Sequence, residues 1–298
     1  MRLNLKVIRF STLVLTGMIL LAGCATDDEV TPLNDAQIES RGLTTGFIPN
    51  TPLIGLSPNN ELVNFTSGPP AQDLGVVPIT GLRDLEVVLA IDTRPATKEL
   101  FAVTNQNFIY IIDPETGVAT PVSNIPLAPA VNGVMMGFDF DPAADVIRLI
   151  ADSGQNLRIS PETGAVIAID NVINSFTAEI NGSAYTYPGI GSPSKLYSID
   201  IANAVLYRQR DPNSGQLQLV GPLAYYWSGE GGFEITRNNI AFAVQYGHSR
   251  FPMPDGGGTI GGGDDTTQDA YRLFYINLKT GLATSFGKVR PMIGVASL

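Results

Sequence analysis

The chain has 298 residues, of which 28 are acidic and 18 are basic. Charged residues make up 15% of the sequence, against about 25% in an average soluble domain. The net charge of −10 argues against nucleic-acid binding, because phosphate contacts need a basic surplus that displaces counterions. One histidine and one cysteine exclude multi-histidine metal centres, cysteine zinc sites and internal disulfides.

Residues 1–23 have the pattern of a bacterial lipoprotein signal peptide. Basic residues come first, without an acidic one, and a mostly apolar run follows from Phe10 to Ala22. At about 1.5 Å per residue, this run is too short for a stable helix across a hydrocarbon layer of about 30 Å. The tetrapeptide Leu21–Cys24 resembles the lipoprotein processing box. We therefore expect lipidation of Cys24, although a structural thiol in a membrane anchor is the alternative.

A lipid anchor at Cys24 predicts a place in the bacterial cell envelope, with the membrane as a partner. Ala25 follows the cysteine where enteric-type inner-membrane retention uses Asp, so the outer membrane is the expected site. The acidic run Asp27–Glu29 resembles surface-export signals of Bacteroidetes lipoproteins. Residues 24–50 are mostly polar and contain glycine and proline, which is typical of a flexible tether.

From residue 51 onward the chain repeats one unit of short strands rich in Val, Ile, Tyr and Phe. No window sustains a helical period with caps, and Asp-Pro and Thr-Gly pairs supply the turns. In chain order, strands are predicted at Leu53–Leu56, Leu62–Phe65, Gly75–Ile79, Leu89–Asp92, Leu100–Val103, Phe108–Ile111, Met136–Asp139, Ile147–Ile150, Leu157–Ile159, Ser183–Thr186, Leu196–Ile199, Val205–Tyr207, Gly231–Glu234, Ala241–Val244 and Leu273–Ile276.

Small residues mark the first strand of each unit. Ala90, Gly137, Ala184 and Gly232 lie 47, 47 and 48 residues apart, and Gly294 lies 62 further on. The surplus matches a Gly/Asp-rich loop insertion at 253–269. A four-stranded sheet that recurs about every 47 residues is typical of a β-propeller blade. Small residues suit such innermost strands, because these crowd together around the axis.

We predict an all-β, five-bladed β-propeller with four antiparallel strands per blade, formed by residues 51–298. The C-terminal strand within 291–298 and the three N-terminal strands would otherwise leave two unpaired edges. Pairing them closes a fifth blade and removes both edges. The alternative is a sandwich of tandem antiparallel sheets, which lacks such internal periodicity.

Three segments, Ile79–Leu82, Gly137–Pro142 and Ser153–Arg158, resemble a bacterial family known as domain of unknown function 4394. The likeness extends from about Leu53 to Leu298. The resemblance implies an extracytoplasmic repeat domain without an established activity, so it transfers no catalytic residue.

Carboxylates fall at one register position of the repeat. Asp92, Asp139 and Glu234 occupy it in three units, and we align Thr186 and Ala296 with them in the other two. Strand alternation places these side chains near the axis. Three carboxylates around one channel predict a site for a hard cation such as Ca²⁺, the one cofactor that we consider. Alternatively, Asp92 and Asp139 cap the turns that follow them.

A second set of residues offers ligand-binding chemistry. Aromatic side chains beside polar groups suit stacking on a sugar or peptide, and arginines recognise anionic groups. The alternatives are burial of the aromatic residues between blades and inter-blade salt bridges of the arginines with Asp139, Asp141 or Asp152. The candidates are Tyr225, Tyr226, Trp227, Glu230, Arg148 and Arg158.

Apparent enzyme motifs do not fit the repeat. Ser192–Lys195 and Lys279–Gly281 spell S-x-x-K and K-T-G, but the third element of that enzyme class is absent and Pro193 opposes the helix that the first motif needs. His248 lies beside Ser249 without a G-x-S-x-G elbow. The insertion 253–269 is acidic enough to wrap calcium, yet a solvated loop fits its low hydrophobicity better.

The sequence therefore favours a lipid-anchored, monomeric binding or interaction module whose ligand is a glycan, peptide or protein. The alternative is a calcium-dependent hydrolase or lactonase that uses Asp92, Asp139 and Glu234. Propellers carry both classes of function, so the fold cannot decide between them.

Overall fold

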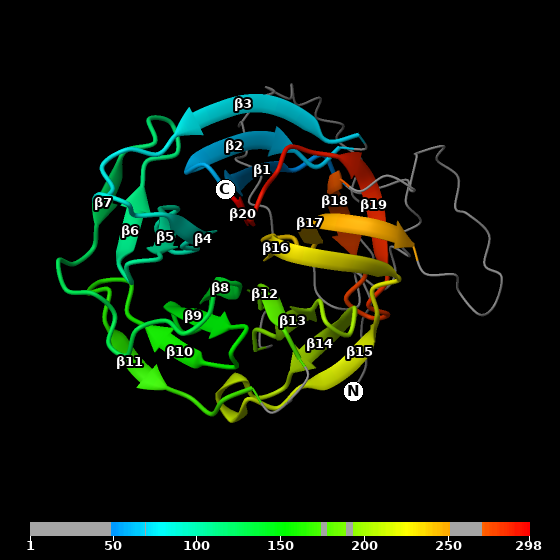
Figure 1. Cartoon of the computed structure of the whole chain (residues 1–298). Helices are drawn as coiled ribbons and strands as arrows, with labels where there is room; N and C mark the ends of the chain where they lie inside the picture. The colour runs from blue at the N-terminus through cyan, green and yellow to red at the C-terminus, as the bar shows by residue number, and fades with distance from the viewer. Residues whose placement is uncertain (1–48, 69, 174–177, 189–192, 251–269) are drawn as a thin grey trace, which may run out of the picture. The chain divides into compact units, whose positions relative to one another are not determined.

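Five four-stranded antiparallel sheets surround a common centre in the computed structural model of the chain (Figure 1). The structure describes residues 49–68, 70–173, 178–188, 193–250 and 270–298. Chain contacts separate Met1–Thr31 from Pro32–Leu298, and the fold below is that of the second unit alone. The predicted signal peptide, Cys24 and the predicted insertion 253–269 lie outside the described residues. No described helix has the length and apolar character needed to span a membrane.

Each blade has its strands in chain order from the innermost to the outermost, except the blade that closes the ring. Blade 1 contains β4 (Val88–Thr93), β5 (Leu100–Thr104), β6 (Ile109–Ile112) and β7 (Ala119–Pro121). Blade 2 contains β8 (Met136–Asp141), β9 (Val146–Ala151), β10 (Asn156–Ile159) and β11 (Val166–Ile169).

The remaining three blades follow the same plan. Blade 3 contains β12 (Ile180–Tyr185), β13 (Leu196–Asp200), β14 (Val205–Gln209), the short helix η1 (Pro212–Ser214) and β15 (Gln218–Pro222). Blade 4 contains β16 (Tyr225–Ile235), β17 (Ala241–Arg250), β18 (Ala270–Ile276) and β19 (Ala283–Lys288). Blade 5 contains β20 (Gly294–Ser297), β1 (Pro52–Ser57), β2 (Glu61–Thr66) and β3 (Gln72–Pro78).

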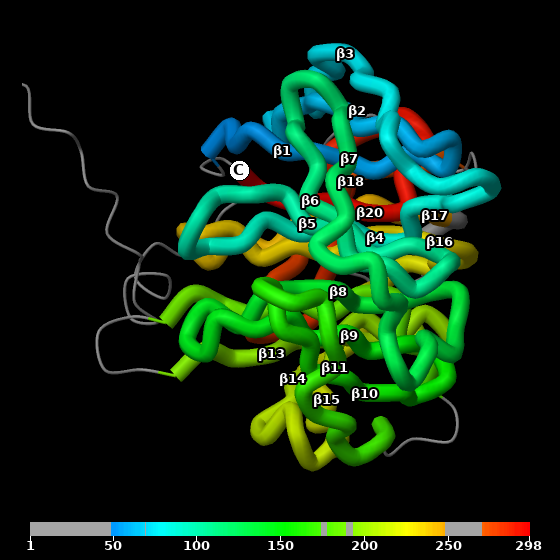
Figure 2. Tube along the Cα trace, turned by 90° about the vertical axis from the view of Figure 1, so that its left-hand side faces the viewer, coloured from blue at the N-terminus to red at the C-terminus, as the bar shows by residue number. Residues whose placement is uncertain are grey.

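The ring closes between the two ends of the described chain. β20 pairs with β1 in antiparallel register, from Leu53 opposite Ser297 to Leu56 opposite Gly294. β20 also lies against β4 and β16, the inner strands of the neighbouring blades (Figure 2). This pairing gives β1 an inner neighbour in place of an exposed edge. The predicted five-bladed propeller and its mode of closure are confirmed.

The blades pack against one another through apolar side chains. Between blades 1 and 2, the rings of Phe101 and Phe140 meet edge to face, with their centroids 5.1 Å apart. Both side chains are buried, and such a contact adds to the free energy gained by removing their area from water. One apolar cluster lies between each pair of neighbouring blades among the described residues.

For the small residues that mark the same position on each inner strand, a set that we call the column, the prediction of Ala184 in blade 3 is wrong. A Cβ atom at Gly137 would lie 2.4 Å from the backbone nitrogen of Ser183, and one at Gly182 would lie 2.7 Å from the Cβ of Phe233. The two glycines thus approach the next inner strand in the same way, so Gly182, not Ala184, belongs to the column. The prediction assumed equal spacing, whereas the inner strand of blade 3 arrives two residues earlier and begins with a register irregularity.

All five inner strands run in the same direction along the ring, because each blade repeats the same antiparallel order. They end at one face, which we call the end face. The turns from an inner strand to the second strand, such as 94–99, 142–145 and 236–240, lie at this face. Residues near the C-terminal ends of the inner strands therefore lie close to its centre.

Candidate functional site

Three carboxylates from three different blades meet near the ring axis. Asp92 lies on β4, Asp139 on β8 and Glu234 on β16, each close to the C-terminal end of its strand. One oxygen atom from each side chain lies within 4.8 Å of the others. Asp92, Asp139 and Glu234 are 5%, 6% and 3% exposed. We call these three residues the axial trio.

Each member of the axial trio holds the inner strand of the next blade. The backbone N–H of Phe140 donates to Asp92 Oδ2 at 2.7 Å, and that of Tyr185 donates to Asp139 Oδ2 at 2.8 Å. Innermost strands have one edge without a strand partner, so their N–H groups need such acceptors. Asp92 and Asp139 thus connect consecutive blades instead of capping only the turns that follow them.

Glu234 makes the corresponding link at the closing blade. Its carboxylate accepts the hydroxyl of Ser297 at 2.5 Å and also the backbone N–H of Ser297. The side chain of Glu234 therefore joins blade 4 to the final strand of the chain. All three links that the axial trio makes run forward along the sequence to the next inner strand, and the third one reaches the C-terminal strand.

The other two blades have alanine at this position. Tyr185 occupies the place of Phe140, so the residue level with Asp139 is Ala184, and the predicted alignment of Thr186 is wrong. Thr186 lies beyond the end of β12, where its hydroxyl accepts the N–H of Lys195. In blade 5 the position belongs to Ala296, as predicted; both alanines are fully buried.

Burial makes the axial trio difficult to ionise. It raises the pKa of Asp92 from 3.8 to about 7, against the backbone N–H bonds of Phe140 and Thr93, which lower it. Burial, followed by the nearby carboxylates of Asp92 and Glu234, raises the pKa of Asp139 well above its ordinary value. Three like charges at this distance need protons or a cation to compensate them.

With divalent cations removed by a chelator, the propeller is expected to lose stability as the pH rises from about 5 to about 8. The folded-state pKa of Asp92 is about 7 and its ordinary value is 3.8, so the folded state binds more protons between these values. The free energy of unfolding therefore falls as the pH rises, by at most about 1.4 kcal/mol per pH unit for one such group. Thermal melts across this range measure it. Asp92→Asn is the control and is expected to give a shallower profile, because the raised pKa values of Asp139 and Glu234 still contribute.

Cationic and phenolic side chains lie near the axial trio at the end face. Burial and the carboxylates of the trio raise the pKa of Tyr187, so this phenol lies within electrostatic range of all three acids. The pKa of Lys98 is lowered by burial and by Arg237, and Glu234 opposes this shift. Lys98 and Arg237 are exposed. They come from turns of blades 1 and 4, so groups of both signs converge at this end of the axis.

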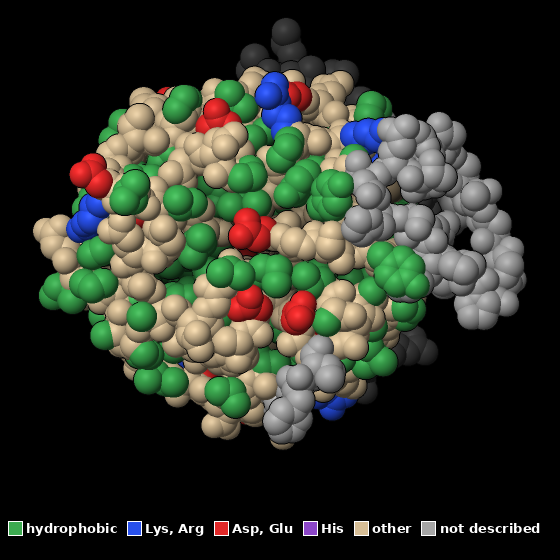
Figure 3. Space-filling model, viewed as in Figure 1, with side chains coloured by type: hydrophobic (Ala, Val, Ile, Leu, Met, Phe, Trp, Pro, Cys, Tyr) green, Lys and Arg blue, Asp and Glu red, His purple; other side chains and the backbone are tan. Residues whose placement is uncertain are grey.

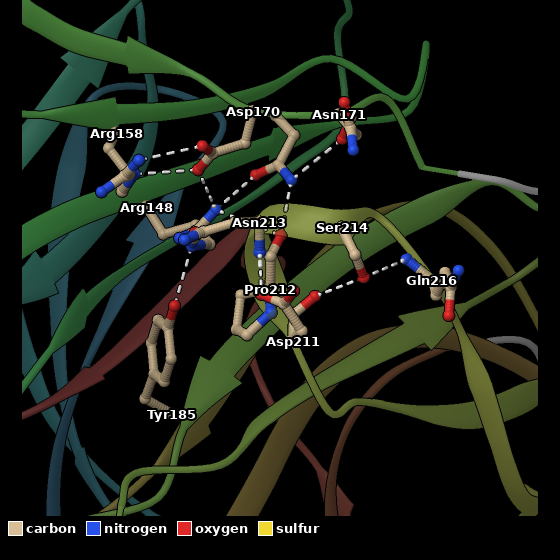
Figure 4. Close-up of polar contacts among 11 residues, drawn as sticks. Arg148, Arg158, Asp170, Asn171, Tyr185, Asp211, Pro212, Asn213, Ser214 and Gln216 are labelled. Atoms are coloured by element: carbon tan, nitrogen blue, oxygen red, sulfur yellow. Dashed lines mark hydrogen bonds and ion pairs between the residues drawn. The ribbon is translucent and has the colours of Figure 1, made fainter.

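The guanidinium group of Arg148 lies in a buried polar network between blades 2 and 3 (Figure 4). The side chain is 4% exposed. Its Nε atom donates to the hydroxyl of Tyr185 at 2.7 Å, and Nη2 donates to Asn213 Oδ1 at 2.7 Å. Its Nη1 atom donates to Asn156 Oδ1 at 2.7 Å and to Asp170 Oδ2 at 2.9 Å. Arg148 therefore fastens two blades together and is not placed to meet a ligand.

Arg158 shares the acidic partner of this network. Its Nε and Nη2 atoms donate to the two oxygens of Asp170 at 2.9 and 3.0 Å. The carboxylate that pairs with both arginines is thus Asp170, not Asp139, Asp141 or Asp152. Asp170 directly follows β11, which pairs with β10, the strand that carries Arg158. Sequence reasoning missed Asp170 because β11 was not among the predicted strands.

The candidate aromatic patch is divided between the core and the surface. Tyr225 and Trp227 are 7% and 5% exposed, and both pack on the ring of Phe274 with centroid distances of 4.9 Å. Tyr226, between them on the opposite side of β16, is 51% exposed, and Glu230 is half-buried. Strand alternation explains this division, so only Tyr226 and Glu230 face solvent.

The apparent enzyme motifs stay without support. Lys279–Gly281 form a tight turn, in which the N–H groups of Lys279 and Thr280 donate to Asn277 Oδ1. Ser192 and the side chains of His248 and Ser249 lie outside the described part of the chain. Figure 3 views the propeller from the side opposite the end face, and there acidic side chains lie near the middle of the view and basic ones nearer its rim.

Five blades around an axial carboxylate cluster define the chain as an all-β propeller. A family model described as a domain of unknown function, DUF4394, matches residues 61–298. The chain belongs to this family. A search among curated proteins found no match.

Three of the solved structures that match the chain come from Bacteroides species. A protein of unknown function from Bacteroides thetaiotaomicron is 11% identical at a TM-score of 0.47; the match covers 79% of this chain and 57% of that protein. An auxiliary nutrient binding protein from the same organism is 11% identical at a TM-score of 0.40, with 64% and 55% covered. A protein of unknown function from Bacteroides caccae is 12% identical at a TM-score of 0.42, with 84% and 99% covered. The chain thus spans little more than half the length of the first two proteins.

Proposed function

We propose that this chain is a lipid-anchored binding protein of the bacterial cell envelope whose ligand binds at the axial end of the propeller. The observation that carries the proposal is the convergence of Lys98, Tyr187 and Arg237 beside the axial trio. These three side chains come from three blades, and the two cationic ones are exposed. A rigid ring that presents convergent polar groups at one mouth is typical of a recognition site.

The charge pattern selects a ligand chemistry. An exposed lysine and arginine suit an anionic group, such as a carboxylate of a peptide or protein or an acidic sugar of a glycan. Tyr187 adds an aromatic surface with a hydroxyl, which supports contacts with sugar or peptide groups. The ligand is therefore a glycan, peptide or protein that carries an anionic group at the point of contact.

The proposed site is tested with the double variant Lys98→Ala/Arg237→Ala on a glycan array and a peptide array. We expect at least a tenfold loss of bound ligand at an unchanged melting temperature, because both side chains are exposed. Lys279→Ala, on an exposed turn of blade 4, is the matched control. An unaltered binding profile for the double variant would contradict the proposed site. A loss with Tyr226→Ala instead would place the ligand at the start of β16, away from the end face.

The proposed location in the cell envelope depends on Cys24. Lipidation there would hold the propeller at the membrane by its buried acyl chains, each methylene contributing about 0.8 kcal/mol. Membrane fractionation of cells that express Cys24→Ser checks this part. Recovery of the variant in the membrane fraction at the level of the unaltered chain contradicts the anchor.

The alternative function is a cation-dependent hydrolase or lactonase that uses the axial trio. Such an enzyme needs a cation with a coordination position that the substrate reaches. Each carboxylate of the trio is at most 6% exposed, and each already holds a neighbouring inner strand. This burial favours binding over catalysis.

A further inference from the structure

The charge on the ring axis lacks compensation among the described residues. The axial trio brings up to three negative charges into a buried space, and no ion pair between the trio and a basic side chain is formed among the described ion pairs. Isolated buried charges cost several kcal/mol each unless a partner neutralises them. Lys98 acts on Glu234 only from an exposed turn.

The spacing of the trio matches the oxygen shell of a large cation. Calcium binds oxygens at about 2.3–2.6 Å, so two ligands on opposite sides of the ion lie about 4.6–5.2 Å apart. The three carboxylate oxygens lie within 4.8 Å of one another. The N–H bonds from the next blade occupy Oδ2 of Asp92 and of Asp139, and the two side chains also lie within hydrogen-bond distance of each other. Two carboxylates in such contact need a shared proton or a shared cation.

A buried hydroxyl without a partner stands at the same level. Thr93 is 4% exposed, and its Oγ1 atom has no hydrogen-bond partner in the structure. Thr93 on β4 has the same place as Ser297 on β20, because each directly follows the residue at the register position of the trio. The hydroxyl of Ser297 donates to Glu234 of the preceding blade. For Thr93 the residue at that position of the preceding blade is Ala296, which offers no acceptor. A lone buried hydroxyl costs free energy unless it acquires a ligand, and a cation accepts such an oxygen.

We propose that Asp92, Asp139 and Glu234 bind a hard divalent cation of the calcium class, with the hydroxyl of Thr93 as a fourth oxygen. The ion compensates two of the three possible negative charges of the trio and connects blades 1, 2 and 4 at the centre of the ring. Calcium suits the site better than magnesium, because magnesium retains waters and demands near-ideal octahedral geometry. This site is separate from ligand binding at the mouth, so either proposal stands if the other fails.

The site is tested by calorimetric titration of chelator-treated full-length chain with calcium chloride, followed by thermal melts. We expect one calcium per chain and a rise in melting temperature of about 5–10 °C at a hundredfold excess over Kd. Magnesium chloride is expected to give a smaller rise. No heat and no shift at millimolar calcium would overturn the proposal and leave protons as the compensating charge.

The variant Asp139→Asn distinguishes these two outcomes by the response to calcium. With a cation site, the unaltered chain gains melting temperature on addition of calcium and the variant does not. With protons alone, calcium changes the melting temperature of neither protein. Asp113→Asn, on an exposed turn that bonds its own backbone, is the control and is expected to keep the full calcium response. Thr93→Val is expected to weaken calcium binding by about tenfold, and an unaltered Kd removes the hydroxyl from the site.

Discussion

A chain that ends at Met292 is expected to lose the propeller fold. Residues 293–298 supply β20, the inner strand of blade 5, and its Val295 and Ala296 are buried. Without β20, the edge of β1 is exposed, the centre of the ring loses one wall, and Glu234 loses both donors of Ser297. Because the blades form one closed ring, this loss removes contacts on both sides of blade 5. We expect near-UV circular dichroism to show no cooperative thermal transition.

Removal of Leu298 alone is the matched control. This residue follows β20 and is 56% exposed, so its loss is expected to change the free energy of unfolding by less than about 0.5 kcal/mol. Cooperative melting of the longer truncation near the temperature of the intact chain would contradict closure by β20.

The variant Arg148→Ala is expected to produce the largest effect of a single side chain. The substitution removes the buried cation beside Asp170. It also leaves the hydroxyl of Tyr185 and the side-chain amide oxygen of Asn213 without the donor that Arg148 supplies. Removing one partner of a buried ion pair costs about 3–5 kcal/mol, which corresponds to a fall in melting temperature of roughly 6–20 °C in a domain of this size. Calorimetry measures both quantities.

Arg158→Ala serves as the comparison, because Arg158 pairs with the same carboxylate from a more open position. Its side chain is 34% exposed against 4% for Arg148, and exposed ion pairs contribute about 0–1 kcal/mol. Equal losses for the two variants would mean that the bond to Asp170 alone, and not the link between blades 2 and 3, carries the stability.

Repetition made the architecture predictable from the sequence. Five blades follow from a period near 47 residues, and the closure follows from two edges that must otherwise stay unpaired. The same regularity caused the error in blade 3, since equal spacing selected Ala184 where the close approach to the next strand requires Gly182. A shift of two residues along β12 leaves the alternation of apolar and polar residues unchanged. The local sequence pattern therefore does not reveal the shift.

The axial trio was predictable for the same reason, whereas its contacts were not. Asp92, Asp139 and Glu234 occupy one register position, but their bonds to the next blade depend on how inner strands face one another. The partners of Arg148 lie farther away, since Asn213 is 65 residues along the chain and sits on a short helix that interrupts the repeat. Pairings of this kind depend on tertiary packing and not on periodicity.

A crystal structure of the propeller grown with calcium chloride is the most direct measurement. We expect one ion on the ring axis, about 2.3–2.6 Å from oxygens of Asp92, Asp139 and Glu234, with β20 paired to β1. Carboxylates that turn away from one another toward separate waters, or a final strand detached from β1, would contradict the closed ring and the site at its centre.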